Sequence, residues 1–325
     1  MKLDSGREIP EPPELLPPPQ KDFRLAPENP LLGQGGYGAT FKYVSGGTTL
    51  AAKVCVRGHD ALNDPTREVE MLKLVSGHEN VINLISHHQL DTWSLKRTWS
   101  LMTSKPAQLG YLIVMEYAGG GDLWGFCEEQ FERNSHTNGG IVLNSHASSI
   151  FRQMVAGVRH MHQRGLAHLD LKPENFVLSA DRRTAKVIDF GMCHELAHGE
   201  VNDHRGRGTL NFAAPEIVTN RLDLVDEAYE AKAADVWALG AVLFFMALGN
   251  FVLGTPGKSH IPDMDHVELY TRRLGQLLTA QTEGRGAMDT ICHANLLGSW
   301  AAKRRRHVPQ PVVQVAMEPS DSTCT

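Results

Sequence analysis

Four polar residues in the middle of the chain have the types and spacing of a phosphate-handling site. Asp170, Lys172 and Asn175 lie within the stretch HLDLKPEN, residues 168–175, and Asp189 follows the apolar run KVI. Apolar segments flank these residues, so packing alone does not require an acid, a lysine and an amide there. Two separated carboxylates with an amide between them suit Mg²⁺, which binds few protein oxygens and completes its shell with phosphate oxygens. One carboxylate would bind the metal, and the other would accept a proton from an attacking hydroxyl.

A lysine inside an apolar strand is a candidate phosphate-binding cation. Lys53 lies in LAAKVCV, residues 50–56, where a buried charge is costly unless it is paired. Its candidate partner is Glu68, in the helical pattern REVEMLKL. A lysine held by a glutamate can offer its charge to phosphate oxygens. The alternative is a surface lysine on an edge strand.

Three glycines form a G-x-G-x-x-G pattern at Gly33, Gly35 and Gly38. Glycine lets the backbone approach a ligand closely, so that amide N–H groups can bind phosphate oxygens. A dinucleotide-binding loop would lead directly into a helix, whereas ATFKYV, residues 39–44, predicts a strand. The pattern therefore argues against a dinucleotide-binding loop, and it leaves open both a phosphate-binding loop between two strands and an ordinary glycine turn.

The front of the chain that must position these residues is rich in predicted strands. Alternating apolar residues and glycine turns predict strands within 31–57, and similar patterns occur at 81–90 and 111–118. Between them, PTREVEMLKLVSG at 65–77 predicts a helix, with proline and acid near its start and glycine at its end.

From about residue 122 onward, long helical periods dominate, notably at 146–164 and 234–249. The apolar stretch VWALGAVLFFMALG within the second of these is too short to cross a bilayer comfortably and predicts a buried core helix. A strand-rich front and a helix-rich back predict two lobes connected through 116–121. Ligands favour the cleft between such lobes.

Composition favours a soluble intracellular protein. The 325 residues allow one large or two modest domains, and a formal net charge of −5 gives no reason to expect nucleic acid as a partner. Five scattered cysteines without a C-x-x-C pair predict reduced thiols. His194 and His198 are four apart but have no acid or cysteine cluster beside them, so we expect ordinary loop histidines.

The two ends of the chain have tail-like compositions. Eight of the first 30 residues are proline, which predicts an extended, disordered lead-in without a secretory signal. One P-x-x-P, at Pro10 and Pro13, leaves a docking role as the alternative. The basic run KRRRH at 303–307 predicts a solvated tail, with nuclear import as the alternative. We therefore expect a cytoplasmic location, or a nuclear one if the basic run is an import signal.

Taken in order, the glycine loop, the strand lysine, the helix glutamate, H-x-D-x-K-x-x-N, D-F-G and A-P-E resemble a eukaryotic-type protein kinase. The resemblance implies a bilobal α+β fold. It divides the chain into a tail (1–27), a β-rich N-lobe with one key helix (28–117), a helical C-lobe (118–302) and a second tail (303–325). It also implies ATP and Mg²⁺ as cofactors and a protein substrate, without a membrane span. The oligomeric state does not follow from it.

The resemblance assigns nucleotide-binding roles to the glycine pattern, the strand lysine and the helix glutamate. Gly33, Gly35 and Gly38 would cover the phosphates. Lys53, held by Glu68, would bind the α- and β-phosphates.

The segment between the lobes resembles the kinase hinge. Met115 would be the gatekeeper, the backbone of Glu116 to Ala118 would bond to adenine, and Asp122 would reach the ribose.

For phosphoryl transfer, the resemblance makes Asp170 the catalytic base and Lys172 the cation on the transferring group. Asn175 and Asp189 would bind Mg²⁺. Lys172 itself and Thr209, in GTLNFAAPE, match the serine/threonine class.

Two further matches concern the C-lobe frame. Asp235 would brace the catalytic loop from the central helix, and Arg285 would pair with Glu216.

The chain departs from the kinase pattern at Leu169, which stands where most kinases have an arginine that binds a phosphate on the activation segment, residues 189–216. That segment contains no serine, no tyrosine and only Thr209. Because the receiving arginine and the usual acceptor sites are missing together, we predict activity that is independent of activation-segment phosphorylation. Arg205 and Arg207 are candidate substitutes for the missing cation.

Two other functions remain as alternatives. A pseudokinase would use the fold as a nucleotide-binding scaffold, but its usual mark is loss of the lysine or of a catalytic or metal-binding aspartate. A nucleotide-regulated membrane protein would need the apolar stretch at 236–249 and the basic run at 303–307 to contact a bilayer.

Overall fold

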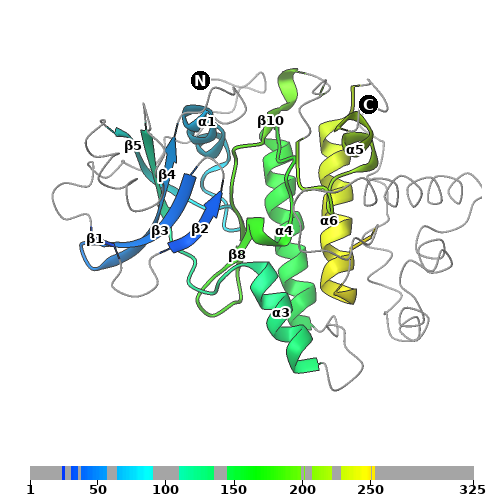
Figure 1. Ribbon diagram of the computed structural model, residues 1–325, viewed down its shortest axis with the longest axis horizontal. Helices are drawn as coiled ribbons and strands as arrows, with labels where there is room; N and C mark the ends of the chain where they lie inside the picture. The colour runs from blue at the N-terminus through cyan, green and yellow to red at the C-terminus, as the bar shows by residue number, and fades with distance from the viewer. Residues whose placement is uncertain are drawn as a thin grey trace, which may run out of the picture.

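The structure is a computed structural model that describes most of the chain between Arg24 and Val252. The described residues are 24–25, 31–35, 38–56, 64–90, 110–134, 145–198, 201, 207–221, 228–249 and 251–252. Figure 1 shows a lobe of strands, coloured blue to cyan, beside a lobe of helices, coloured green to yellow. The expected bilobal α+β fold is confirmed.

The N-lobe is built on one antiparallel sheet of six strands. They are β1 (Arg24–Leu25), β2 (Leu31–Gly35), β3 (Gly38–Ser45), β4 (Thr48–Val56), β5 (Leu84–Leu90) and β6 (Gly110–Glu116). The order is β1-β3-β4-β6-β5, and β2 also pairs with β3. Gly46 and Gly47, with φ of 54° and 80°, form the tight turn between β3 and β4. Strand β4, which carries Lys53, therefore lies inside the sheet.

Helix α1 (Pro65–Val75) is the one long helix described in the N-lobe, and its ends follow local chemistry. Asp64 caps the helix by accepting the N–H of Thr66 at 2.9 Å, and Pro65 has no N–H that would need a partner. Gly77, with φ 88°, turns the chain away after the last turn. The buried face of α1 contacts β5 and β6 and carries Glu68.

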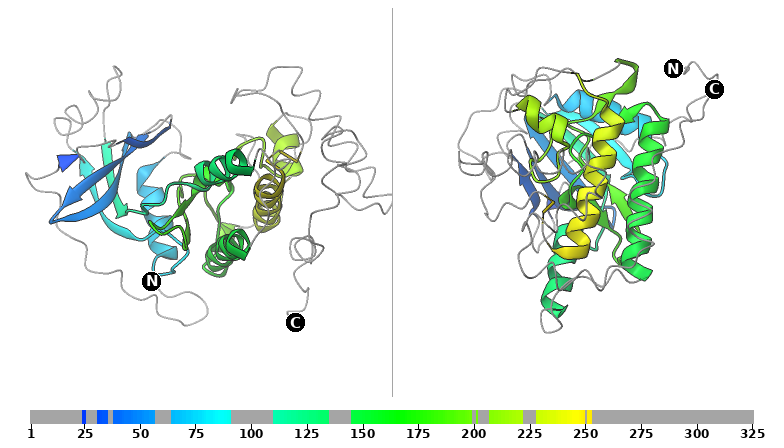
Figure 2. Two further views of the ribbon diagram at one scale, coloured as in Figure 1. Left: turned by 90° about the horizontal axis from the view of Figure 1, so that it is seen from below. Right: turned by 90° about the vertical axis from the view of Figure 1, so that its right-hand side faces the viewer.

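The described C-lobe contains four α-helices and two small antiparallel sheets. The α-helices are α3 (Leu123–Asn134), α4 (Ser145–Gln163), α5 (Pro215–Arg221) and α6 (Ala231–Leu248). One sheet pairs β7 (Leu166–Ala167) with β10 (His194–Glu195), and the other pairs β8 (Phe176–Leu178) with β9 (Ala185–Val187). The short turns η3 (Pro173–Asn175) and η4 (Leu196–His198) complete this part. Figure 2 shows α4 and α6 side by side, and they are in contact.

Helix α6 is the apolar segment that a sequence scan would single out. It is the one helix in the described part that is long and apolar enough to cross a membrane, but 67% of its residues are buried inside the protein. Glu230 caps its start, and Gly249 ends it in a left-handed conformation. The predicted core helix is confirmed, and its burial argues against the membrane-protein alternative.

The observed connection between the lobes lies where the sequence analysis expected it, whereas the start of the N-lobe lies earlier than expected. Strand β6 ends at Glu116 and α3 begins at Leu123, so the lobes are connected where expected. Arg24 and Leu25, by contrast, pair with Val44 and Tyr43, so the sheet begins before the expected domain start at residue 28. The chain can add this strand because β3 offers its free edge for backbone hydrogen bonds. The remainder of the two expected tails, including the basic run, lies outside the described residues.

Candidate active site

Asp235 fixes the backbone of the catalytic loop from the buried helix α6. Its carboxylate is fully buried and accepts the N–H groups of His168 and Leu169, each at 2.8 Å. A third hydrogen bond of 2.8 Å comes from Nε2 of His162 on α4. Leu169 has a left-handed backbone, φ 63°, which costs about 1–2 kcal/mol for a residue with a Cβ. Hydrogen bonds to a carboxylate are strong enough to offset that cost, so the predicted bracing role of Asp235 is confirmed.

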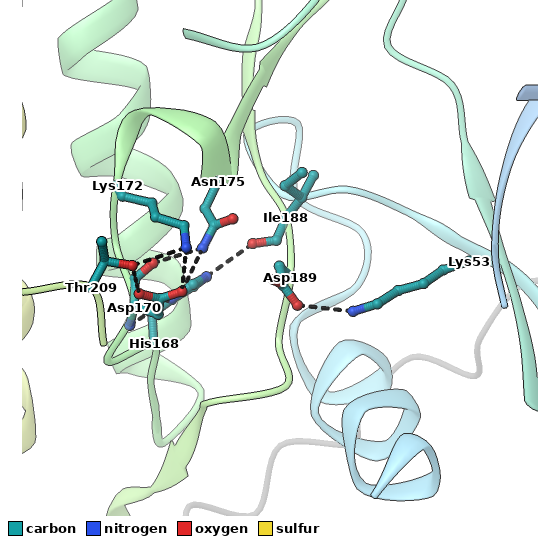
Figure 3. A network of polar contacts seen from close by, with 8 residues as sticks. All are labelled: Lys53, His168, Asp170, Lys172, Asn175, Ile188, Asp189 and Thr209. Carbon is teal, nitrogen blue, oxygen red and sulfur yellow. Dashed lines mark hydrogen bonds and ion pairs between the residues drawn. The ribbon is translucent and has the colours of Figure 1, made fainter. Parts of the chain in front are cut away.

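The predicted transfer residues converge on one polar cluster, drawn in Figure 3. Oδ2 of Asp170 lies 3.0 Å from Nζ of Lys172 and accepts from Nδ2 of Asn175 at 3.2 Å. The same Nδ2 donates to the backbone oxygen of Asp170 at 2.7 Å. Asp170 and Asn175 are both buried, and the short turn η3 brings the amide back onto the acid. The side chains of Asp170, Lys172 and Asn175, which are close in the sequence, are therefore also in direct contact in the structure.

Thr209 joins this cluster from the far end of the activation segment. Its hydroxyl donates to Oδ1 of Asp170 at 2.8 Å and accepts from Nζ of Lys172 at 2.9 Å. Oδ1 of Asp170 is thus oriented to receive a hydroxyl proton, which a base acting on an alcohol requires. Burial has the largest single effect on the pKa of Lys172 and lowers it, but Asp170, Glu174 and Asp189 together raise the pKa above its usual value, so the ammonium group stays charged.

His168 connects the catalytic loop to the segment that carries Asp189. The buried ring accepts the N–H of Asp170 on Nδ1 at 3.2 Å. Its proton is therefore on Nε2, which donates to the backbone oxygen of Ile188 at 3.0 Å. This assignment follows from the hydrogen-bond network. One neutral imidazole thereby ties the positions of Asp170 and Asp189 together.

Lys53 forms the predicted ion pair and a second one across the lobes. Its Nζ lies 2.6 Å from Oε1 of Glu68 and 2.9 Å from Oδ1 of Asp189, the contact at the right of Figure 3. The lysine side chain is 20% exposed and belongs to an inner strand. The alternative of a surface lysine on an edge strand is therefore wrong.

These three charges change one another's pKa. Burial alone would lower the pKa of Lys53, but Asp189 and Glu68 raise it well above its usual value. Lys53 lowers the pKa of Asp189 to about 2, against the opposing effect of burial. Burial has the larger effect on Glu68, whose pKa is raised despite Lys53. Solvent screens part of the pair with Asp189, whose side chain is 43% exposed. Lys53 and Asp189 are both charged at neutral pH.

Asn175 and Asp189 have oxygen atoms available for a cation. Among the described residues, both hydrogen bonds of the Asn175 side chain come from Nδ2, so its amide oxygen has no partner there and can act as a ligand. Asp189 binds Lys53 through Oδ1, which leaves Oδ2. Amide and carboxylate oxygens are the ligand types that Mg²⁺ prefers, with phosphate oxygens completing its shell. The donor set therefore fits the predicted Mg²⁺–nucleotide complex.

The glycine pattern lies at the junction of β2 and β3, where Gly35 pairs with Gly38. A Cβ on Gly38 would come within 2.5 Å of the backbone oxygen of Val54, so the approach of β4 requires glycine there. No atom of the described residues lies within 4 Å of a Cβ placed on Gly33, so they impose no such requirement. The tip of the loop, residues 36 and 37, lies outside the described residues. Phosphate binding by the three glycines stays a prediction.

The hinge residues have structural partners that the sequence did not indicate. Oε1 of Glu116 accepts the N–H of Asn83 at 2.7 Å and Nζ of Lys186 at 2.9 Å. The N–H of Glu116 donates to the oxygen of Asn83 at 3.1 Å, so this N–H is engaged within the protein. Oδ1 of Asp122 caps the first turn of α3 at 2.8 Å, and its other oxygen remains for a ribose. Binding of the nucleotide by these residues stays a prediction.

Sequence reasoning missed several contacts of the site. Thr209 was used only as a marker of substrate class, although its partners lie 37 and 39 positions away. His162 and His168 gave no local signal for their bonds to Asp235 and Ile188. The predicted pairing of Glu216 with Arg285 lies outside the described residues.

Comparisons with known proteins agree with this geometry. Residues 27–284 match the family model described as the protein kinase domain. CBL-interacting protein kinase 9 of Oryza sativa subsp. japonica is 32% identical over 216 residues, 65% of this chain and 40% of the relative. Calcium-dependent protein kinase 27 of Arabidopsis thaliana is 30% identical over 227 residues, 67% of this chain and 40% of the relative. CBL-interacting serine/threonine-protein kinase 9 of the same plant is 30% identical over 236 residues, 69% of this chain and 44% of the relative.

The matched region is thus less than half the length of each of these relatives. The family model, however, covers most of this chain and includes every residue of the cluster around Asp170 and Lys53. The same residues form the ion pairs and hydrogen bonds described above. The chain therefore belongs to the protein kinase family.

Proposed function

We propose that the protein transfers the γ-phosphoryl group of ATP to serine or threonine hydroxyls of a protein substrate. The observation that carries this proposal is the Thr209 hydroxyl on Oδ1 of Asp170, because a substrate hydroxyl would present the same group to the same oxygen. Asp170 accepts that proton as the hydroxyl oxygen attacks phosphorus. Lys172, whose Nζ lies 3.0 Å from Asp170, offers positive charge to the group in transfer.

The nucleotide side of the reaction depends on the ion pairs of Lys53. Held by Glu68 at 2.6 Å, the ammonium group is fixed in place before any ligand arrives, so little reorganisation is needed to orient phosphates. Asn175 and Asp189 would hold Mg²⁺. When bound, the metal supplies charge that neutralises the phosphate oxygens.

We further propose that activity does not require phosphorylation of the activation segment. Leu169 is 4% exposed and belongs to an apolar cluster with Val201, a residue of that segment. Val201 and Tyr229 exchange two backbone hydrogen bonds, of 2.9 and 3.0 Å, just before α6. Pairing of β10 with β7 ties the start of the segment to the catalytic loop. Apolar packing and backbone pairing thus support the segment without a phosphate.

The hydroxyl inventory supports the same proposal. Thr209 is the one serine, threonine or tyrosine between Asp189 and Glu216. Its hydroxyl is engaged with Asp170 and Lys172, so a phosphate there would disrupt the site.

The alternative is a pseudokinase that binds nucleotide as a scaffold. Lys53, Asp170 and Asp189, whose loss usually marks such proteins, are all present. A transfer assay distinguishes the two functions, because only an active kinase transfers phosphate from ATP to a substrate.

A peptide-library assay tests both proposals. Phosphatase-treated protein is incubated with Mg²⁺–ATP and peptides that contain serine, threonine or tyrosine. We expect serine and threonine phosphorylation by the wild type and loss of transfer in Asp170→Asn, with ATP binding retained in calorimetry. Asp181→Asn, the same chemical change on the exposed turn between β8 and β9, should leave transfer unaltered.

Each contrary outcome has one meaning. ATP binding without transfer by the wild type supports the scaffold alternative. Transfer that begins only after an upstream kinase phosphorylates the activation segment contradicts phosphorylation-independent activity. Unchanged transfer in Asp170→Asn contradicts the role of this residue.

A further inference from the structure

Two arginines from different elements donate to one backbone oxygen. Nη2 of Arg67, on helix α1, and Nη1 of Arg207, late in the activation segment, each lie 3.1 Å from the oxygen of Cys193. The same Nη1 donates to the backbone oxygen of Met192 at 2.7 Å. Cys193 lies just after Asp189 in the chain. This junction therefore joins α1 to the start and the end of the activation segment, and Figure 1 shows α1 beside the green chain that leads into β10.

The junction gives α1 a second attachment to the activation segment. Glu68, the neighbour of Arg67, binds Lys53, and Lys53 also binds Asp189 at the start of the segment. Asp189 and Cys193 are four positions apart, so adjacent residues of the helix connect to neighbouring parts of the segment, Glu68 through Lys53 and Arg67 directly. One attachment would let the helix rotate about the contact. Two attachments fix the rotation that directs Glu68 toward Lys53.

Packing alone does not account for this pair of cations. A guanidinium has five donors and no acceptor, and Arg207 is buried with only 6% exposure. Two guanidinium groups at one oxygen also repel each other, whereas an apolar side chain would fill the space without that cost. Where the catalytic loop packs near the activation segment, it contributes the apolar residue Leu169 and not a cation. The cations that hold the segment therefore come from α1 and from the segment itself.

We propose that Arg67 is a positioning residue for phosphoryl transfer, which couples helix α1 to the activation segment through the Cys193 carbonyl, with Arg207 as its partner. The coupling keeps the Lys53–Glu68 pair formed in the unphosphorylated protein. The effect of Arg67 on kcat can be measured only if the proposed transfer activity is present. Its effect on hydrogen exchange in α1 does not depend on that activity.

The test compares Arg67→Met with Arg67→Lys in the full chain. Methionine keeps an unbranched stem and removes the donor, whereas lysine restores a charged donor that can reach a carbonyl. Lys73→Met is the matched control, because Lys73 lies on the same helix and has no hydrogen bond to the described part of the activation segment. We measure peptide phosphorylation, the thermal unfolding midpoint and hydrogen exchange of backbone amides.

We expect Arg67→Met to lower kcat about tenfold, the value of one charge-assisted hydrogen bond made in the active arrangement. Lysine should restore most of the rate. Exchange of α1 amides should accelerate in Arg67→Met and stay unchanged in α4, with the same unfolding midpoint in all variants. Lys73→Met should match the wild type.

Equal kcat and equal α1 exchange in Arg67→Met and wild type would overturn the proposal. A uniform rise in exchange with a lower unfolding midpoint, unrescued by lysine, would also overturn it, because it indicates a general structural role. If the wild type transfers no phosphate, the proposed function fails by itself. The α1 exchange of Arg67→Met then still decides the coupling.

Discussion

Restoring an arginine at position 169 should destabilise the protein and should not create regulation by phosphorylation. Leu169 is 4% exposed and belongs to a cluster with Val201, Ile217 and Phe244. Its backbone N–H is bound to Asp235, whose carboxylate already accepts three hydrogen bonds. A guanidinium in this cluster therefore meets apolar side chains and an acid that is already engaged in three hydrogen bonds.

The expected loss can be worked out from these contacts. Removing a buried leucine side chain costs about 2–5 kcal/mol, and leaving a buried charge without compensation costs about 3–5 kcal/mol. The arginine stem retains part of the apolar contact, and its charged end can move toward solvent. We therefore expect Leu169→Arg to lower the free energy of unfolding by about 3–5 kcal/mol. That is a large part of the roughly 5–15 kcal/mol typical of a folded domain.

Urea unfolding measures this loss, with Leu169→Met as the volume-matched control. With an m value of about 3 kcal/mol per molar, Leu169→Arg should lower the midpoint by about 1 M or more. The methionine variant should lose less than about 1.5 kcal/mol. In the transfer assay, phosphatase treatment should leave the activity of both variants unchanged. A Leu169→Arg protein as stable as the wild type, with activity that disappears on phosphatase treatment, would refute the reasoning.

Three further predictions concern the site. Asp235→Ala leaves two backbone donors and one imidazole without a partner, each worth about 1–3 kcal/mol, so thermal unfolding should show a loss of at least about 3 kcal/mol. Thr209→Val should reduce kcat about tenfold, and Thr209→Ser should retain it, because serine keeps the hydroxyl that binds Asp170. The depressed pKa of Asp189, about 2, means that its contribution to stability is complete above about pH 4 and is lost as the pH falls toward 2. Lys53→Met should remove this contribution, so its urea midpoint should depend less on pH in that window than the wild-type midpoint does.

The parts of the site that could be predicted from sequence are those fixed by short spacing or by apolar context. Asp170, Lys172 and Asn175 lie so close in the chain that one turn brings them together. Lys53 in an apolar strand had to be paired, and Glu68 on the nearby helix was the available acid. Burial of a charge is a strong constraint, so these assignments needed no knowledge of the lobes' arrangement.

The parts that could not be predicted depend on where distant segments meet. Lys53 and Asp189 are 136 positions apart, and the contact of Arg67 with Cys193 spans 126. Periodicity gives the element that carries each residue but not the angle between lobes or the path of a loop. The hinge shows the same limit, since the Glu116 side chain turned out to bind Lys186.

Leu169 shows how the geometry of the catalytic loop is held independently of the side chain at this position. The left-handed turn at this residue is held through its backbone N–H and that of His168, both bound to Asp235. Those bonds do not involve the Leu169 side chain, so the position of Asp170 does not depend on which side chain stands before it. The side chain is then free to contact the activation segment by charge or by apolar packing. With leucine, the side chain belongs to an apolar cluster that includes Val201 of the segment, and this packing involves no charged group. Under the proposed phosphorylation-independent activity, regulation would act on whether the segment and α1 are held together.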